Sequence, residues 1–252
     1  MGYIITVFNQ KGGVGKTTTV VNFSHALAKR KQKILVVDMD PQANASSCFG
    51  SENGEKNIYD LLINKDLSAI TTTNIANLSI IYSSPELAGV ELELSKEDSW
   101  QYILKNELIK IKDDFDYIII DCPPSLGVLS IMSLVASDSI LIPVQSEYYA
   151  LEGVGQLMNT ITLVKENFNP DLKIEGVVMC MYDSRTNLSV QVKREVENFF
   201  KDLVYKTNIP RNVRLAEAPS FGMSIFSYDN ISKGAWAYRS LAKEFLKGRE
   251  NG

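Results

Sequence analysis

The chain has 252 residues, of which 45% are hydrophobic, so it is long enough to bury a full core, and we expect one domain over residues 1–252. Its formal net charge of −4 excludes a uniformly basic nucleic-acid binder, and neither a long apolar run nor a cleavable leader marks it for a membrane or for export. The three cysteines, Cys48, Cys122 and Cys180, lie far apart, which favours free thiols over a disulfide or a metal site. We expect a cytoplasmic protein.

The first part of the chain predicts a strand, a glycine-rich loop and a helix, in that order. The run YIITVF from Tyr3 has the β-branched composition of a buried strand, and residues 17–31 carry apolar residues at helical spacing. Between them lies KGGVGKTT, at residues 11–18. A glycine-rich loop in this context points its backbone amides at a phosphate group bound at the start of the helix. The sequence therefore predicts a phosphate loop for a nucleotide, which we take to be ATP.

Most positions of this loop have a predicted role. We expect the Lys16 ammonium to reach the β and γ phosphates, the Thr17 hydroxyl to bind Mg²⁺ and Thr18 to donate to the α phosphate. The backbone that approaches the phosphates closely belongs to Gly12, Gly13, Val14 and Gly15. The common pattern G-x-x-x-x-G-K-[ST] is not complete, because Gln10 stands where its first glycine would be, with a second lysine, Lys11, beside it.

Two further apolar runs end in acidic residues. VVDMDPQ places Asp38 and Asp40 after one predicted strand, and IIIDCPP places Asp121 after another. Ligands of open α/β sheets bind at the carboxyl ends of the strands, so these acids could converge on the phosphate loop. We assign Asp121 to Mg²⁺, usually through water, with Asp38 in the same second shell. Asp40 is predicted to orient or deprotonate the attacking water, although Asp-Pro is also a common turn.

Strands and helices alternate along the rest of the chain. Further β-branched runs begin near residues 33, 78, 117, 139 and 174, and helical spacing recurs over 99–112, 126–137, 151–167, 187–201 and 231–249. This alternation predicts an α/β fold of the P-loop NTPase type, with a mostly parallel, twisted sheet and helices on both faces.

Charge is distributed unevenly along the chain. Residues 51–121 contain fourteen acidic and six basic side chains, whereas residues 185–239 contain nine basic and five acidic ones. The basic region permits a polyanionic partner such as nucleic acid, but both regions are equally compatible with ordinary solvated surfaces.

KGGVGKTT, DMDPQ and DCPPSLG together resemble the deviant Walker A ATPases of the ParA/MinD group, and the similarity spans nearly the whole chain. Within that group, QSEYYALEG from Gln145, MYDSRTNLSVQV from Met181 and IPRNVRLAEAPSFG from Ile209 are similar to the partition ATPases called Soj or ParA. The resemblance implies an ATP-dependent homodimer that sandwiches the nucleotides. It also implies that Lys11 reaches the phosphates of the partner subunit as a catalytic cation, with Gly12 close to that partner.

The same resemblance implies that the ATP-bound dimer binds double-stranded DNA nonspecifically on the nucleoid, and that a ParB-like centromere-binding protein stimulates slow hydrolysis. It further implies that the loop with Pro210 and Asn212 contacts adenine. We expect the DNA phosphates to be bound by basic side chains of the carboxyl-terminal third, namely Arg185, Lys193, Arg194, Arg211, Arg214 and Lys233. Because the chain begins almost directly at its first predicted strand, no amino-terminal helix-turn-helix domain is expected.

Other functions share parts of this pattern. A MinD-like ATPase recruited to a membrane would use the same phosphate site, and an apolar stripe of Trp236, Leu241, Phe245 and Leu246 could form its anchor, although such a stripe more often packs on a core. Cys122 alone is too little for a cluster shared between subunits, and the tail lacks the tyrosines of a tyrosine kinase. A nucleotide-held binding switch with negligible turnover stays open.

Overall fold

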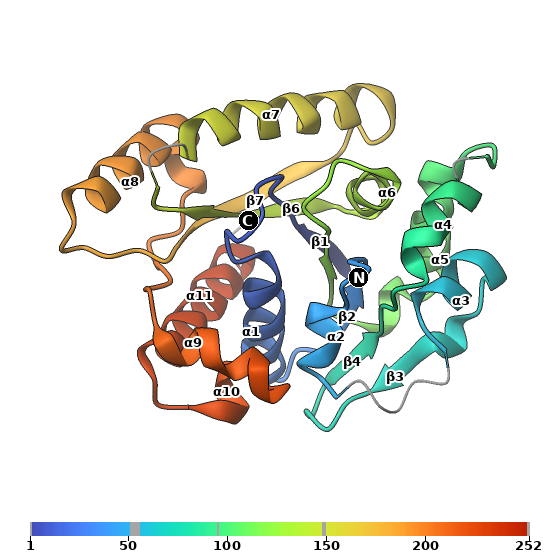
Figure 1. The fold of residues 1–252 in the computed structure, drawn as a ribbon, viewed down its shortest axis with the longest axis horizontal. Helices are drawn as coiled ribbons and strands as arrows, with labels where there is room; N and C mark the ends of the chain where they lie inside the picture. Colours follow the sequence, from blue (N-terminus) through green and yellow to red (C-terminus); the bar gives the residue numbers. More distant parts are fainter. Residues whose placement is uncertain (1, 51–55, 95, 148–149, 251–252) are drawn as a thin grey trace.

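The computed structural model describes residues 2–50, 56–94, 96–147 and 150–250. Seven strands form one sheet (Figure 1): β1 (Tyr3–Val7), β2 (Ile34–Asp38), β3 (Ile70–Thr72), β4 (Leu78–Ile81), β5 (Tyr117–Asp121), β6 (Ser139–Gln145) and β7 (Lys173–Cys180). Their order across the sheet is β3-β4-β2-β5-β1-β6-β7. Every neighbouring pair is parallel except β3 with β4, so the predicted mostly parallel α/β sheet is confirmed.

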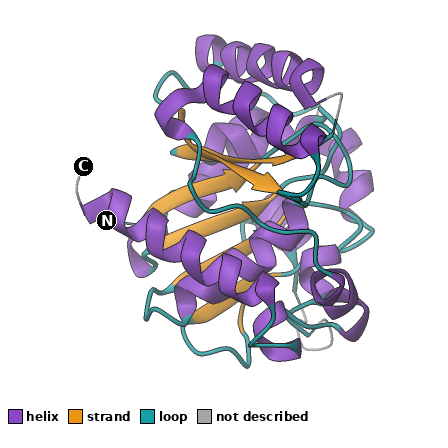
Figure 2. Cartoon of the chain, turned by 90° about the vertical axis from the view of Figure 1, so that its left-hand side faces the viewer, coloured by secondary structure: helices purple, strands orange, loops and turns teal. Residues whose placement is uncertain are grey.

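Helices cover both faces of the sheet (Figure 2). They are α1 (Lys16–Ala28), α2 (Asn44–Ser47), α3 (Ile58–Asn64), α4 (Leu87–Leu94), α5 (Ile103–Ile109), α6 (Val128–Ala136), α7 (Ala150–Asn167), α8 (Asn187–Phe200), α9 (Val213–Glu217), α10 (Ile225–Tyr228) and α11 (Lys233–Glu250). Side chains of α1, α10 and α11 form the core on one face. Helices α3 to α8 supply two core clusters on the other face.

The central strands are apolar along their whole length because both of their faces are covered. In β1, Ile5 and Val7 pack into the core beneath α1 and α11, whereas Ile4 packs into the core of the opposite face. All three side chains are at most 1% exposed. The alternation follows from the pleat, which points successive side chains to opposite faces. This packing fixes the strand register and aligns the carboxyl ends of β1, β2 and β5.

Several short elements differ from the sequence prediction. The helix expected over residues 99–112 is reduced to α5, because the segments on both sides of it tighten into the 3-10 turns Trp100–Tyr102 and Lys112–Asp114. The edge strand β3 and the helices α2, α3, α4, α9 and α10 were not predicted. Most of them are too short to show a clear hydrophobic period.

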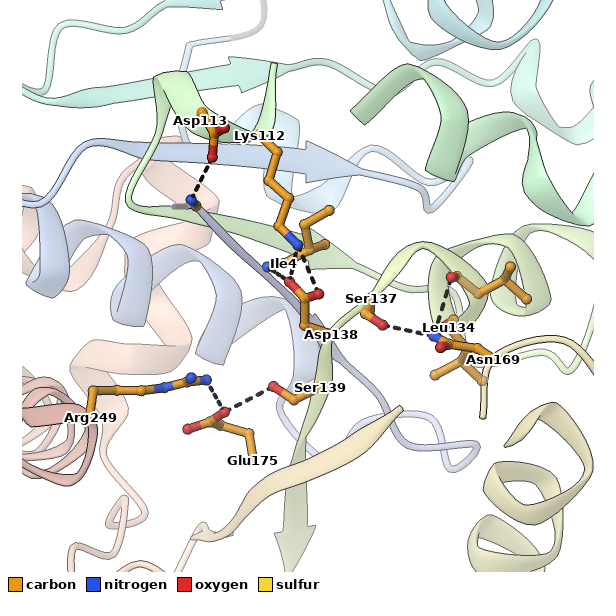
Figure 3. Close-up of polar contacts among 12 residues, drawn as sticks. Ile4, Lys112, Asp113, Leu134, Ser137, Asp138, Ser139, Asn169, Glu175 and Arg249 are labelled. Carbon is orange, nitrogen blue, oxygen red and sulfur yellow. Dashed lines mark hydrogen bonds and ion pairs between the residues drawn. The ribbon is translucent and has the colours of Figure 1, made fainter. Parts of the chain in front are cut away.

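Carboxylates at the amino ends of the strands are held by protein donors (Figure 3). Asp138 accepts a hydrogen bond from the Ile4 amide at 2.8 Å, and its Oδ2 lies 2.8 Å from the Lys112 Nζ. Glu175 forms an ion pair with Arg249, which comes from the last turns of α11. These contacts tie the connections between the strands to one another, as expected of groups that stabilise the fold.

The apolar stripe of the last helix packs on the core. Leu241 and Phe245 are at most 2% exposed, Leu246 is half-buried against the same core, and Trp236 is 62% exposed. The Phe245 ring meets the Phe23 ring of α1 edge to face, with centroids 5.2 Å apart. Among the described residues, no helix combines the length and the apolar character that crossing a bilayer requires. The stripe is therefore largely used by the fold, as the more common role of such a stripe predicts.

Candidate functional site

The glycine-rich loop joins β1 to α1 at the carboxyl end of the central strand, as its sequence predicts. Gly13 and Gly15 have φ values of 76° and 98°, in the left-handed region that favours glycine. A Cβ atom at Gly15 would also lie 3.7 Å from the Cys180 Sγ, because the loop passes close to the end of β7. The order β5-β1-β6 places the loop where strand order reverses, which is the common ligand position of open α/β sheets.

Lys16 is buried at the start of α1. The residue is 7% exposed, and its Nζ donates a hydrogen bond to the Lys11 carbonyl oxygen at 3.1 Å. Burial lowers the pKa of Lys16, whereas the proximity of Cys122, Asp121 and Asp40 raises it. The structure thus brings the predicted phosphate-binding lysine close to two of the predicted acidic residues.

Asp121 ends β5 and is completely buried beside the phosphate loop. Neither oxygen of its carboxylate accepts a hydrogen bond from the described part of the chain. Burial raises the pKa of Asp121 well above its usual value, and the charge of Asp38 raises it further, while the nearby Thr17 hydroxyl and the Lys16 charge oppose the shift. The arrangement is electrostatically costly in the absence of a cation.

Asp38 lies opposite Asp121 in the register of β2 and β5, but its oxygens are engaged by the protein. Oδ1 accepts from the Asp40 amide at 3.1 Å, and Oδ2 accepts from the Ser46 amide at 2.8 Å and from the Ser46 hydroxyl at 2.7 Å. Burial raises its pKa to about 6, against the lowering effect of these hydrogen bonds. The predicted second-shell role of Asp38 in metal binding stays a prediction, and its observed contacts organise the loop that follows β2.

Asp40 lies in that loop and is 8% exposed. Its Oδ1 accepts a hydrogen bond from the Gln42 amide at 3.0 Å, which is the local turn that Asp-Pro predicts. The turn does not exclude a chemical role, because a carboxylate that accepts one bond keeps further acceptor positions. Asp40 belongs to the same cluster as Lys16 and Asp121, because its charge raises the pKa of both side chains.

Lys11 points away from this cluster. Its Nζ forms an ion pair with Glu147 Oε2 at 2.8 Å, and the two side chains are 41% and 50% exposed. Its amide donates to Asn9 Oδ1 at 3.0 Å, while Gln10 donates to the Thr160 hydroxyl at 2.6 Å. Lys11 is therefore an exposed cation beside the loop, held by an acid of its own chain.

A cavity of about 320 Å³ opens beside the first turn of α1. Pro210 and Asn212, the two predicted adenine contacts, both line it next to Gly15 and Thr18. The loop with Pro210 is fixed to the end of β7, since the Ile209 amide donates to the Met179 carbonyl at 2.8 Å. The cavity is mostly apolar and has a few polar groups, as expected for a nucleobase site next to a phosphate loop.

Sequence analysis missed other residues that line this cavity. They are Cys180, Met181, Ile209, Leu215, Ala216 and Tyr238. Arg211, which was predicted to contact DNA, also lines the cavity. A signal was available for Cys180 and Met181, because they end the run IEGVVMCM and ligands gather at the carboxyl ends of strands. Tyr238 comes from α11, far along the chain, and no local pattern pointed to it. The three cysteines are buried free thiols, as predicted.

The predicted DNA-binding residues lie on several elements of the carboxyl-terminal third. Arg185, Lys193 and Arg211 gather around the segment that follows β7: Arg185 pairs with Asp183, and Lys193 lies over the Tyr182 ring. Three of the six predicted residues form ion pairs with nearby acids, namely Arg185 with Asp183, Lys193 with Glu197, and Arg214 with Glu217 and Asp229. Arg194 and Lys233 are exposed on α8 and α11.

Comparison with known proteins agrees with this geometry. The AAA domain family model matches residues 2–174. Sporulation initiation inhibitor protein Soj of Bacillus subtilis is 53% identical over 248 residues, which cover 97% of this chain and 98% of that protein. Chromosome partitioning protein ParA of Myxococcus xanthus is 47% identical over 251 residues, covering 98% and 89%.

A similar solved structure is that of cobyrinic acid a,c-diamide synthase from Mycobacterium smegmatis with bound ATP analog and magnesium. It is 35% identical, has a TM-score of 0.86 and covers 100% of this chain and 97% of that one. The whole sheet and its helices are therefore shared with a protein that carries a nucleotide and a metal ion. On these similarities, the chain belongs to the Soj/ParA family of partition ATPases.

Proposed function

We propose that this chain hydrolyses ATP with Mg²⁺ at the carboxyl ends of β1, β2 and β5. The observation that carries the proposal is the buried Asp121 carboxylate, whose oxygens accept no hydrogen bond from the described residues. An unpaired buried carboxylate is costly to a fold, and it is tolerated where a ligand completes it. Thr17 and Lys16 lie beside it in the phosphate loop, so a magnesium nucleotide is the ligand with matching charge.

The acidic residues present fit a metal ion that arrives with the nucleotide. Within the described ranges, no group of three or more His, Cys, Asp or Glu side chains could hold a metal ion. Mg²⁺ at phosphate sites commonly takes only one or two protein groups, with phosphate and water oxygens for the rest. Thr17 and Asp121 would hold it, with Asp38 in the outer shell, and it would neutralise charge on the phosphates.

The chain's own groups would then perform the remaining chemistry. Lys16 would bind the β and γ phosphates, and Asp40 would orient the attacking water or accept its proton. Burial of both side chains supports this assignment, because electrostatic interactions act more strongly away from bulk water. The cavity beside Pro210 and Asn212 would take the adenine.

We further propose that ATP holds two copies of the chain together through the loop side of the sheet. Gly12 supports this proposal, because it lies outside the left-handed region and a Cβ atom there would meet no described heavy atom within 4 Å. The packing of this chain therefore leaves room for a side chain at position 12. A second subunit that approached this loop closely would fill that room and so require glycine. Lys11 would exchange Glu147 for the phosphates of the partner subunit.

The dimer would bind double-stranded DNA nonspecifically, and a ParB-like protein would stimulate hydrolysis on the nucleoid. Support comes from the exposed basic side chains after β7, which present Arg185 and Arg194 to solvent. Phosphate contacts of this kind release counterions, so affinity should fall steeply with salt and depend little on sequence. Dimerisation would double the number of such contacts.

The first experiment is DNA co-sedimentation of the Asp40→Ala protein with ATP, with ADP and without nucleotide. The variant should bind ATP and accumulate as a dimer, so we expect it to sediment with DNA only when ATP is present. Equal sedimentation under all three conditions would refute nucleotide-gated DNA binding. Turnover of the wild-type protein, measured as phosphate release with and without DNA, distinguishes an enzyme from a binding switch.

The same samples on anionic liposomes test the MinD-like alternative. Because Leu241 and Phe245 are used by the core, we expect no ATP-dependent liposome binding. Liposome binding without DNA binding would replace the partition role by a membrane role, with the same ATPase site.

A further inference from the structure

Four residues around Asp40 form a closed ring of hydrogen bonds. The Asp40 amide donates to Asp38 Oδ1 at 3.1 Å, and Asp38 Oδ2 accepts from the Ser46 hydroxyl at 2.7 Å. The Ser46 hydroxyl accepts from the Ser83 amide at 2.8 Å. The Ser83 hydroxyl closes the ring by donating to the Asp40 carbonyl oxygen at 2.7 Å.

The ring joins segments that are distant in sequence. Asp38 and Asp40 follow β2, Ser46 lies in α2, and Ser83 follows β4, which is the neighbour of β2 in the sheet. All four residues are at most 8% exposed. Hydrogen bonds this well shielded from water restrict motion more than exposed ones do. The ring therefore holds both backbone polar groups of Asp40, its amide from one side and its carbonyl from the other.

We propose that Ser83 is a positioning residue for ATP hydrolysis, because it fixes the backbone of Asp40 and so the direction in which the Asp40 carboxylate points. This inference rests on the proposed role of Asp40 toward the attacking water. Phosphoryl transfer depends mainly on positioning, so a small displacement of that carboxylate lowers the rate without touching the groups that bind the nucleotide. Ser83 is not among the residues that line the adenine cavity.

Ser83→Ala is the most informative variant, because it removes one bond without leaving the Asp40 carbonyl unpaired. That carbonyl also accepts from the Ala43 amide at 2.9 Å, and the Ser83 amide keeps its bond to Ser46. The variant should fold. Ser46→Ala would be less specific, since it would withdraw partners from both Asp38 and Ser83.

The test measures phosphate release at saturating Mg·ATP together with the affinity for ATP. We expect kcat of Ser83→Ala to fall about 10-fold, while ATP affinity stays within about twofold of wild type. Ser83→Thr keeps a hydroxyl and should restore most of the rate. The matched control is the adjacent Ser84→Ala, since the buried Ser84 hydroxyl has no hydrogen-bond partner among the described residues and should be dispensable.

A double variant separates this inference from the proposed function. If Ser83 acts through Asp40, then Ser83→Ala/Asp40→Ala should keep the residual rate of Asp40→Ala, measured as phosphate release over a single turnover with the protein in excess of ATP. Wild-type turnover in Ser83→Ala, with Asp40→Ala strongly impaired, would overturn the positioning role and leave the ATPase proposal intact. A parallel loss of ATP affinity and folding stability in Ser83→Ala would also overturn it, as a purely structural effect. Wild-type turnover in Asp40→Ala would overturn the proposed role of Asp40 itself.

Discussion

Both ends of the parallel strands carry buried or half-buried carboxylates, but the protein supplies their hydrogen-bond donors differently at the two ends. At the amino ends, Asp138 is bound by the Ile4 amide and by Lys112, and Glu175 pairs with Arg249. At the carboxyl ends, Asp121 is more deeply buried, yet its oxygens accept no hydrogen bond from the described residues. Desolvation there raises the pKa of the carboxyl instead.

This difference indicates which charges serve the fold and which await a ligand. A carboxylate with protein donors contributes to stability, whereas one without them costs stability until a cation or donor arrives. Asp38 lies between these cases, because it is at the ligand end but is bound by Ser46 and Asp40. Its observed contacts organise the loop that carries Asp40, while Asp121 remains the better candidate for the metal.

The largest contrast between the two ends is expected from replacing their lysines. Lys16→Ala should weaken ATP binding about 100-fold or more, because the phosphates would lose a buried cation. Lys112→Ala should leave ATP affinity within about twofold, since its partner Asp138 lies at the opposite end of the strands. Titration of each variant with ATP and Mg²⁺ provides the measurement. Similar losses in both variants would mean that affinity follows general stability rather than a local contact.

Replacing Asp121 and replacing Asp138 should change the stability of the folded protein in opposite directions. The raised pKa of Asp121 means that the folded protein retains a proton at pH values where the unfolded chain, with a pKa near 3.8, has lost it. Stability of the nucleotide-free protein therefore falls as pH rises above about 4, until the folded-state pKa is passed. Asp121→Asn should remove that loss, so the nucleotide-free variant should be more stable than the wild-type protein at pH 8.

Asp138→Asn should instead destabilise the protein by about 1–3 kcal/mol, because it breaks the contact with Lys112. Urea unfolding between pH 5 and pH 8, on nucleotide-free protein, would compare the two variants. The advantage of Asp121→Asn should shrink as the pH is lowered toward about 4. If Asp121→Asn were destabilising at every pH, its carboxylate would be part of the structural network after all.

A structural feature could be predicted from the sequence only where a local pattern of residues indicates it. The phosphate loop, the strand-end acids and the six longer strands follow from spacing and composition, because a buried parallel strand is apolar throughout. Helix α3 also has a start signal in the sequence that was not used for the prediction. Asn57 and Asp60 have the spacing of a capping box, and in the structure they form its reciprocal hydrogen bonds. Strand β3 is three residues long and left none.

Asp38 and Asp121 show why the rest required the structure. Both end apolar runs, and the sheet places them side by side in register, so their sequences predict the same role. They differ because Ser46 of α2 donates two hydrogen bonds to Asp38, while the Asp121 oxygens form no hydrogen bond with the described residues and have only the Thr17 hydroxyl nearby. Contacts between irregular segments leave no period in the sequence, and the ring through Ser83 is of this kind.

The smallest expected effect concerns DNA binding by Arg185. Arg185 already forms an ion pair within its own chain, as Asp138 does with Lys112 at the amino ends of the strands. The Arg185 side chain is 87% exposed and its Nη2 lies 2.7 Å from Asp183 Oδ2, so binding to DNA must replace an existing ion pair. We expect Arg185→Ala to weaken DNA binding only about threefold and to reduce the salt dependence by about one phosphate contact. Nucleotide affinity should not change, since Arg185 is not among the residues that line the cavity beside Pro210 and Asn212.

Asp183→Asn provides the opposite test of the same contact. Removing the competing carboxylate frees Arg185 for phosphate, so DNA affinity should rise by about the same small factor, and more at low salt. Both variants would be titrated with a short duplex, with ATP, at several salt concentrations. If the salt dependence of DNA affinity were unchanged in Arg185→Ala, this residue would not be part of the interface. If Asp183→Asn did not change DNA affinity, the ion pair would not limit binding.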